Sequence, residues 1–209
     1  MKVLKITNFF RIAADASGLS FNDLYPMKFL RGQEVRKVES HTKVEVVTAI
    51  LSKKKKRFIL TVNASKPYSS EIKMLLPLLE RMNIRARYFL GDRGYDSVKL
   101  MTKLQGIGIS SVIQIREAFR FQAKNPLRIL SRDLSNNKDL YKPRYLTESL
   151  FGNIKQKHTS HIFVKSLKMA EKYALLRLIA FNISFFFESL KSFLCLFILT
   201  LFDYGIETT

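Results

Sequence analysis

Apolar positions along the chain fall into two kinds of pattern. Short runs that alternate or are continuously apolar are typical of β-strands, and longer segments with apolar residues three or four apart are typical of helices. The strand-like runs are Arg11–Ser17, His41–Leu51, Arg57–Val62, Arg87–Leu90 and Ser110–Ile115. The second and third runs read as neighbouring strands, because only the basic turn Lys53–Lys56 lies between them. This turn is either simply solvated or in contact with phosphate.

Apolar residues with helical spacing follow the strand-like run Arg57–Val62. A helix capped by one of two serines is predicted over Ser69–Met82, with its apolar residues facing the sheet and with Pro77 kinking or splitting it. A second helix is predicted to run through Gln105, capped by Asp96 or Ser97, of which we take Asp96 as the cap.

Two stretches have neither pattern. Residues 19–40 are polar and interrupted by proline and glycine, so they are predicted to be irregular. Residues 116–140 are polar and basic and are predicted to form a loop with a short helix. The C-terminal part is predicted to be helical, with a long segment over Phe163–Phe187 and a richer apolar run over Phe193–Phe202.

One further helix is predicted to begin at Pro143, because proline is well suited to the first helical position. At about 100° per residue, Arg144, Glu148 and Lys155 fall within about 40° of one another, and Tyr141 lies just ahead on the same side. The opposite face is apolar and consists of Leu146, Leu150 and Ile154. By itself this arrangement is equally typical of a surface helix with an i,i+4 ion pair.

The charge of the chain narrows its possible partners. Its 209 residues carry a net charge of +19, with a pI near 10.1, which indicates a polyanionic partner, nucleic acid first and anionic membrane second. A single cysteine excludes an internal disulfide and a cysteine metal site, which fits a reducing compartment. Residues 1–15 lack a long apolar segment, so no secretory signal is expected.

The spacing of the four residues on the polar helix face, Y-(2)-R-(3)-E-(6)-K, resembles the signature of a large group of DDE transposases of bacterial and archaeal insertion sequences. These transposases use two aspartates ahead of the glutamate. The motif DRGYD, which begins at Asp92 just after a predicted strand, resembles their second-aspartate motif. The sequence IAADASGL, which contains Asp15, resembles their first-aspartate motif more loosely.

The resemblance implies an α/β fold, namely a ribonuclease-H-like mixed sheet flanked by helices, with an apolar C-terminal helical segment. The predicted order of strands and helices agrees with that fold and places each acidic residue on the element that the fold requires. Residues 1–187 are then predicted to be the catalytic domain, with the basic loop 116–140 inside it, and residues 188–209 an apolar helical extension.

The same resemblance implies that Asp15, Asp92 and Glu148 are catalytic and hold two Mg²⁺ (or Mn²⁺) ions. Asp15 would bridge both ions, Asp92 would hold one and Glu148 the other. Two such cations stabilise both the entering and the leaving oxygen of an in-line phosphodiester displacement, and these ions prefer carboxylate ligands. The DNA-binding residues it implies are Tyr141, Arg144, Lys155 and Arg93.

The expected function is therefore the catalytic core of a transposase that cleaves and joins double-stranded DNA at transposon ends and target, as a homodimer when active. A cytoplasmic, nucleoid-associated location and no membrane span are expected, because the run Phe193–Phe202 is half of the roughly 20 apolar residues that a bilayer requires. The alternatives are an inactive or truncated DNA-binding remnant, a ribonuclease-H-like nuclease without strand transfer, and a membrane-associated protein. Only fourteen residues precede Asp15, too few for a helix-turn-helix, so we expect either a different start codon or a core fragment.

Overall fold

A computed structural model of the chain describes residues 8–28, 35–51, 56–82, 85–116 and 124–206. A six-stranded mixed sheet forms its centre. The strands are β1 (Asn8–Lys28), β2 (Val35–Leu51), β3 (Lys56–Ser65), β4 (Arg85–Gly91), β5 (Ser110–Ile113) and β6 (His161–Ile162). Their order is β3-β2-β1-β4-β5, and β6 adds to β1. The first three strands are antiparallel, while β4, β5 and β6 join in parallel.

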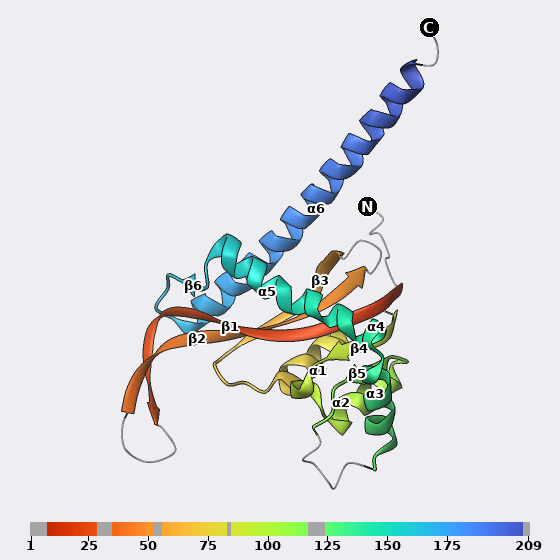
Figure 1. Cartoon of the computed structure of the whole chain (residues 1–209). Helices are drawn as coiled ribbons and strands as arrows, with labels where there is room; N and C mark the ends of the chain where they lie inside the picture. The colour runs from red at the N-terminus through yellow and green to blue at the C-terminus, as the bar shows by residue number, and fades with distance from the viewer. Residues whose placement is uncertain (1–7, 29–34, 52–55, 83–84, 117–123, 207–209) are drawn as a thin grey trace.

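Helices cover both faces of this sheet (Figure 1). Helices α1 (Glu71–Arg81) and α2 (Val98–Gly106) pack on one face, against residues such as Ile12 and Ala14 of β1. Helices α5 (Tyr145–His158) and α6 (Leu167–Ile206) pack on the other, against Leu19 and Phe21 of the same strand. Helices α3 (Pro126–Asn136) and α4 (Lys138–Tyr141) lie near β5. The prediction of an α/β mixed sheet flanked by helices, consistent with a ribonuclease-H-like fold, is confirmed.

Both edge strands are covered by a side chain that bonds their free backbone groups. On β3, the Asn182 side chain accepts from the Ile59 N–H at 2.9 Å and donates to the Ile59 carbonyl at 2.8 Å. On β5, Ser131 Oγ does the same for Ile113, at 2.9 and 3.3 Å. These contacts hold α6 and α3 against the two strands, and each satisfies the backbone groups of one edge residue.

The predicted strands and their order are found, with two corrections at the N-terminal end. β1 continues through residues 19–28, and β2 begins at Val35, so most of the stretch predicted to be irregular is a two-stranded arm that extends from the sheet (Figure 1). Pro26 fits in this arm because β1 there pairs with β2 alone in the described residues, which leaves one edge without ladder bonds. Asp15 therefore lies within β1 and not at its end. The predicted basic turn lies almost entirely outside the described residues.

The first two helices also differ in detail from the prediction. Helix α1 is continuous, and Pro77 sits exposed on its outer side, where the loss of one N–H bond is outweighed by the buried residues Leu75, Leu78 and Leu79. Ser97, and not Asp96, caps α2, since its Oγ accepts from the Leu100 N–H at 3.5 Å.

Asp96 has a different partner, which local sequence patterns could not reveal. Its Oδ2 lies 2.6 Å from Nη2 of Arg128, and each of these side chains is only 2% exposed. Arg128 belongs to α3, so the predicted loop 116–140 in fact contains two helices, and this ion pair fixes one of them beside the turn after β4. A buried charge needs a partner of opposite sign, which is why the two residues pair across 32 positions of sequence.

The C-terminal elements are also longer or displaced. Pro143 lies in a 3₁₀ turn, η4 (Lys142–Arg144), and α5 begins two residues later than predicted. The two predicted C-terminal segments form one helix, α6, which starts after Phe163 and runs on beyond the sheet (Figure 1). Within the described part of the chain, no helix is long and apolar enough to cross a membrane.

Candidate active site

The parallel pairing of β1 with β4 brings the two predicted aspartates together. Ala13 of β1 is paired with Leu90 of β4, and two residues further along each strand path stand Asp15 and Asp92. Because side chains alternate between the faces of a sheet, Asp15 lies on the same face as Ala13, whereas Asp92 is the first residue after the end of β4. The backbone ladder at the centre of the sheet thus determines the spacing of both carboxyl groups.

The turn after β4 fixes the Asp92 side chain. Its Oδ1 accepts a hydrogen bond of 2.7 Å from the Gly94 N–H. A Cβ atom at position 94 would lie 2.7 Å from an oxygen of Glu71 and 2.8 Å from Asp92 Oδ1, distances that side-chain carbons do not adopt. A side chain at this position would therefore displace the carboxylate of Glu71 or of Asp92, so glycine helps to keep the Asp92 carboxylate in place.

The next residue of the turn is anchored from the opposite face of the sheet. Tyr95 is fully buried, and its hydroxyl donates to Oε1 of the equally buried Glu45 at 3.0 Å. The other carboxyl oxygen of Glu45 has no hydrogen-bond partner among the residues that the structure describes. Burial foremost raises the pKa of Glu45 to about 8, so this carboxyl holds its proton at neutral pH. Sequence reasoning missed this pair, although a charged residue in an apolar strand was the signal for it.

Glu148 comes from α5, which crosses the same face of the sheet as Asp15 (Figure 1). Two polar contacts fix the helix in place. The hydroxyls of Thr147 and Thr48 are 2.7 Å apart and buried, and Lys155 Nζ donates to Ser17 Oγ on β1 at 2.8 Å. Leu146, Leu150 and Ile154 are buried beneath the helix, as predicted.

The charges of the other two predicted carboxyl groups act on Asp15. The pKa of Asp15 is raised to about 6, first by burial and then by the negative charges of Glu148 and Asp92. Arg144 partly opposes this effect, and its Nη2 lies 2.7 Å from Glu148 Oε1. Arg144 thus bonds to Glu148 and also acts on the charge of Asp15.

The four predicted DNA-binding residues are not all in one place. The Arg144 guanidinium lies between Glu148 and the ring of Tyr141, whose centroid is 5.4 Å from Arg144 Cζ. Lys155 lies farther along the same helix face, over Ser17. Arg93 is exposed in the 3₁₀ turn η2 (Arg93–Tyr95), next to Asp92.

The donors do not converge to metal-coordinating distance. Among the described residues, no three histidine, cysteine, aspartate or glutamate side chains are close enough to hold an ion. The position of Glu148 suggests why, since its carboxylate is bonded to Arg144 and 49% of its side chain is exposed.

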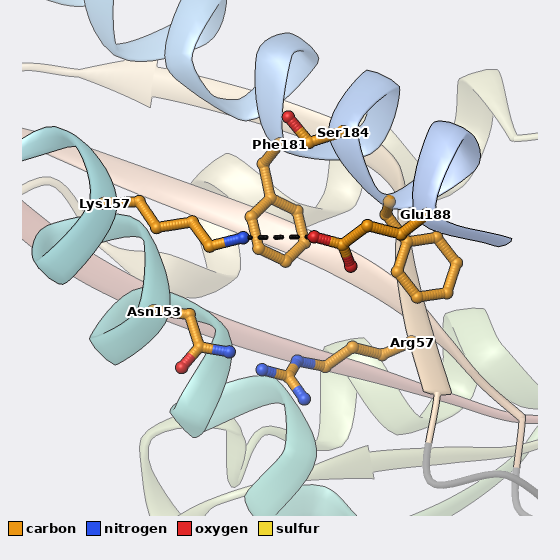
Figure 2. Close-up of a pocket in the computed structure, with 7 residues that line it drawn as sticks. Arg57, Asn153, Lys157, Phe181, Ser184 and Glu188 are labelled. Carbon is orange, nitrogen blue, oxygen red and sulfur yellow. Dashed lines mark hydrogen bonds and ion pairs between the residues drawn. The ribbon is translucent and has the colours of Figure 1, made fainter. Parts of the chain in front are cut away.

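A separate pocket of about 170 Å³ lies where α5, α6 and β3 meet. None of the predicted site residues lines it. Figure 2 shows the Arg57 side chain reaching from β3 towards Asn153, with the ion pair of Lys157 and Glu188 above them. This ion pair is 3.5 Å long and both side chains are more than half exposed, so it contributes little to stability.

Comparison with known proteins decides the family. A model of the transposase DDE domain matches residues 35–183, more than half of the chain. The chain belongs to this family. Asp92 and Glu148 lie within the matched span of the transposase domain, and Asp15 precedes it. The predicted family is confirmed, while membership of the subgroup with the Y-(2)-R-(3)-E-(6)-K signature remains a prediction.

Two further proteins are similar to this transposase domain. An uncharacterized protein of Aquifex aeolicus (strain VF5) is 28% identical over 186 residues, which cover 88% of the chain and 57% of that protein. A chain in the cryo-EM structure of the simian T-cell lymphotropic virus intasome in complex with PP2A regulatory subunit B56 gamma is 12% identical, with a TM-score of 0.36. That match covers 79% of this chain and 48% of the other. The chain spans about half the length of each protein.

Proposed function

We propose that this transposase domain is a catalytic core that cleaves DNA strands at the ends of an insertion sequence and joins them to target DNA. The observation that supports it best is the placement of the three predicted carboxyl groups. Asp15 lies in β1, Asp92 directly follows the adjacent parallel strand β4, and Glu148 lies on helix α5; the last two are close enough to Asp15 to raise its pKa. Membership of the transposase DDE family agrees with this reading.

DDE transposases generally use divalent metal ions, and we propose two Mg²⁺ or Mn²⁺ ions held by Asp15, Asp92 and Glu148. The residues fit such ions by donor chemistry, because carboxylate oxygens are the preferred ligands of both. They also fit by charge, because a nearby cation would oppose the burial and the neighbouring negative charges that raise the pKa of Asp15. When bound, the ions would supply the electrostatic stabilisation of the phosphodiester oxygens.

The Arg144–Glu148 ion pair suggests how DNA binding and metal binding are connected. Glu148 can turn towards the aspartates only if it leaves Arg144, and Arg144 then needs another anion. A phosphate of the transposon end can take that place through two parallel hydrogen bonds to the guanidinium. Tyr141 would hold the Arg144 side chain from its other side, and Lys155 and Arg93 would add point charges along the DNA.

The remaining parts of the proposal concern the whole protein. Residues 1–187 would form the catalytic domain, and residues 188–209 would be a helical extension that continues α6. The active form would be a homodimer that binds the two transposon ends and the target DNA. A cytoplasmic, nucleoid-associated location goes with a DNA substrate of this kind.

A strand-transfer assay tests the proposal. The purified chain would be incubated with Mg²⁺ or Mn²⁺ and with duplexes that carry the genomic DNA flanking its gene, together with a circular target plasmid. We expect nicked duplex ends and covalent joining to the plasmid, which Glu148→Gln abolishes. Nicks without joined products would indicate a nuclease, and binding without either product would indicate a DNA-binding remnant.

A further inference from the structure

Helix α6 has two different faces over its first half. One face packs on the sheet and consists of Ala170, Ala174, Leu178 and Phe181, all of them buried. On the same side Asn182 forms its two hydrogen bonds with the edge strand β3. This side of the helix is therefore committed to the protein's own core.

The other face carries large apolar side chains in contact with solvent. Six of them are between 41% and 61% exposed, namely Met169, Tyr173, Leu176, Ile183, Phe187 and Leu190. Together with the partly buried Ala180 they are separated by alternating steps of four and three residues. In the sequence the same steps continue within α6 through Leu194, Phe197, Leu201 and Tyr204. We call the positions of this row from Met169 to Leu190 the α6 seam.

An unbroken alternation of four and three is the pattern of a coiled-coil interface. A straight helix has 3.6 residues per turn, so a strict seven-residue apolar repeat keeps to one face only when two helices supercoil around each other. A helix that merely covers a sheet needs no such regularity, and the sheet-facing side of α6 is already filled. The described part of the repeat, residues 169–190, has no charged position, so this surface suits an apolar partner.

The exposed area fits a second copy of the chain. The six exposed seam residues and the flanking Ile179 and Phe186, 53% and 62% exposed, make eight large apolar side chains. At roughly 100 Å² each, they present on the order of 800 Å², which is what a stable interface of standard size takes from each partner. Two copies of one seam match in length and in apolar character along their whole extent.

We propose that the α6 seam is the self-association surface of this protein, packing against the seam of a second copy as a coiled coil. Only the consequence of this pairing rests on the proposed function: it would bring two catalytic domains together for two transposon ends. The association itself requires neither DNA nor metal, because the seam contains no catalytic or DNA-binding residue.

The test is the oligomeric state of the full-length chain, measured by sedimentation velocity across a range of concentrations in high salt without DNA or metal. We expect a dimer that Ile183→Glu dissociates, with a dissociation constant raised more than about 100-fold because two unpaired charges would be buried together. The matched control is Leu130→Glu on α3, since Leu130 and Ile183 are 50% and 51% exposed but only the latter lies in the seam. The control should remain dimeric, and the far-UV circular dichroism spectra of both variants should match that of the unaltered chain.

Two results would overturn the proposal. One is an unaltered chain that stays monomeric at all concentrations, or a dimer that Ile183→Glu leaves intact. The other is a monomer that floats with phosphatidylcholine vesicles unless Ile183 is changed, which would assign the seam to a lipid surface. Strand-transfer activity is measured in a separate assay. A monomeric chain would therefore not argue against the proposed chemistry, and an inactive chain would not argue against the proposed dimer.

Discussion

The two aspartates and the glutamate of the proposed site are held in different ways. Asp15 and Asp92 depend on the backbone ladder between β1 and β4, at the centre of the sheet, which cannot shift without loss of many hydrogen bonds. Glu148 depends on a helix that crosses the sheet and is fixed by the side-chain contacts of Thr147 and Lys155. The two aspartates are therefore positioned by the sheet, whereas the proposed metal site requires Glu148 to move towards them.

The largest loss of cleavage activity is expected from removing any one of the three carboxylates. Asp15→Asn, Asp92→Asn and Glu148→Gln should each lower the rate of strand cleavage at least about 1,000-fold, because each removes charge from the proposed metal site. Single-turnover cleavage with Mg²⁺ measures this effect. Glu80→Gln is the matched control, since Glu80 forms a surface pair with Lys103. Near-normal cleavage by any of the three variants would remove that residue from the site.

The next effect concerns stability and pH. The pKa of Asp15 is about 6 in the folded chain and 3.8 in a model peptide, so the unfolded chain loses its proton first as pH rises. Stability should therefore fall between about pH 4 and 6, by up to about 3 kcal/mol. Asp15→Asn should restore this amount at pH 7 without metal and add nothing below pH 4, as measured by chemical unfolding. An equal gain at both pH values would contradict the raised pKa.

A smaller loss is expected where the turn that carries Asp92 is anchored. Tyr95→Phe removes the hydrogen bond to the buried Glu45 and should destabilise the fold by about 1–3 kcal/mol, because a buried polar group loses its partner. Adding Glu45→Gln to this variant should change stability less than Tyr95→Phe alone. Thermal melts of the two single variants and the double variant measure the coupling. Strict additivity would mean that the pair does not act as a unit.

The smallest effect on stability is expected from loosening helix α5 next to Glu148. Thr147→Val removes the contact with Thr48 and should cost about 1 kcal/mol of stability. Cleavage should nonetheless fall by about tenfold, because Glu148 is the next residue and small displacements in a catalytic group are costly. Ser149→Ala, at the residue on the other side of Glu148, is the control. A loss of activity that merely follows the loss of stability would show that Thr147 does not position Glu148.

Sequence reasoning found the parts of this site that depend on local patterns. The sequence pattern placed Asp92 directly after a strand and Glu148 on the polar face of α5, whereas their proposed roles rested on the resemblance to DDE transposases. The pairs Glu45–Tyr95 and Asp96–Arg128 were not, because each joins residues at least 32 positions apart through burial in the folded core. The length of β1 was missed because a proline usually ends a strand. Pro26 does not end β1, because the strand continues to pair with β2 on both sides of it.

Asp15, Asp92 and Glu148 are proposed to form one metal site, on which the proposed function depends. The most direct measurement is calorimetric titration of Mn²⁺ into the unaltered chain and into Asp15→Asn, Asp92→Asn and Glu148→Gln, at pH 7 without DNA. We predict that each substitution weakens Mn²⁺ binding at least about tenfold, with the two aspartates mattering more than the exposed glutamate. Binding that stays unchanged in all three variants would contradict the claim.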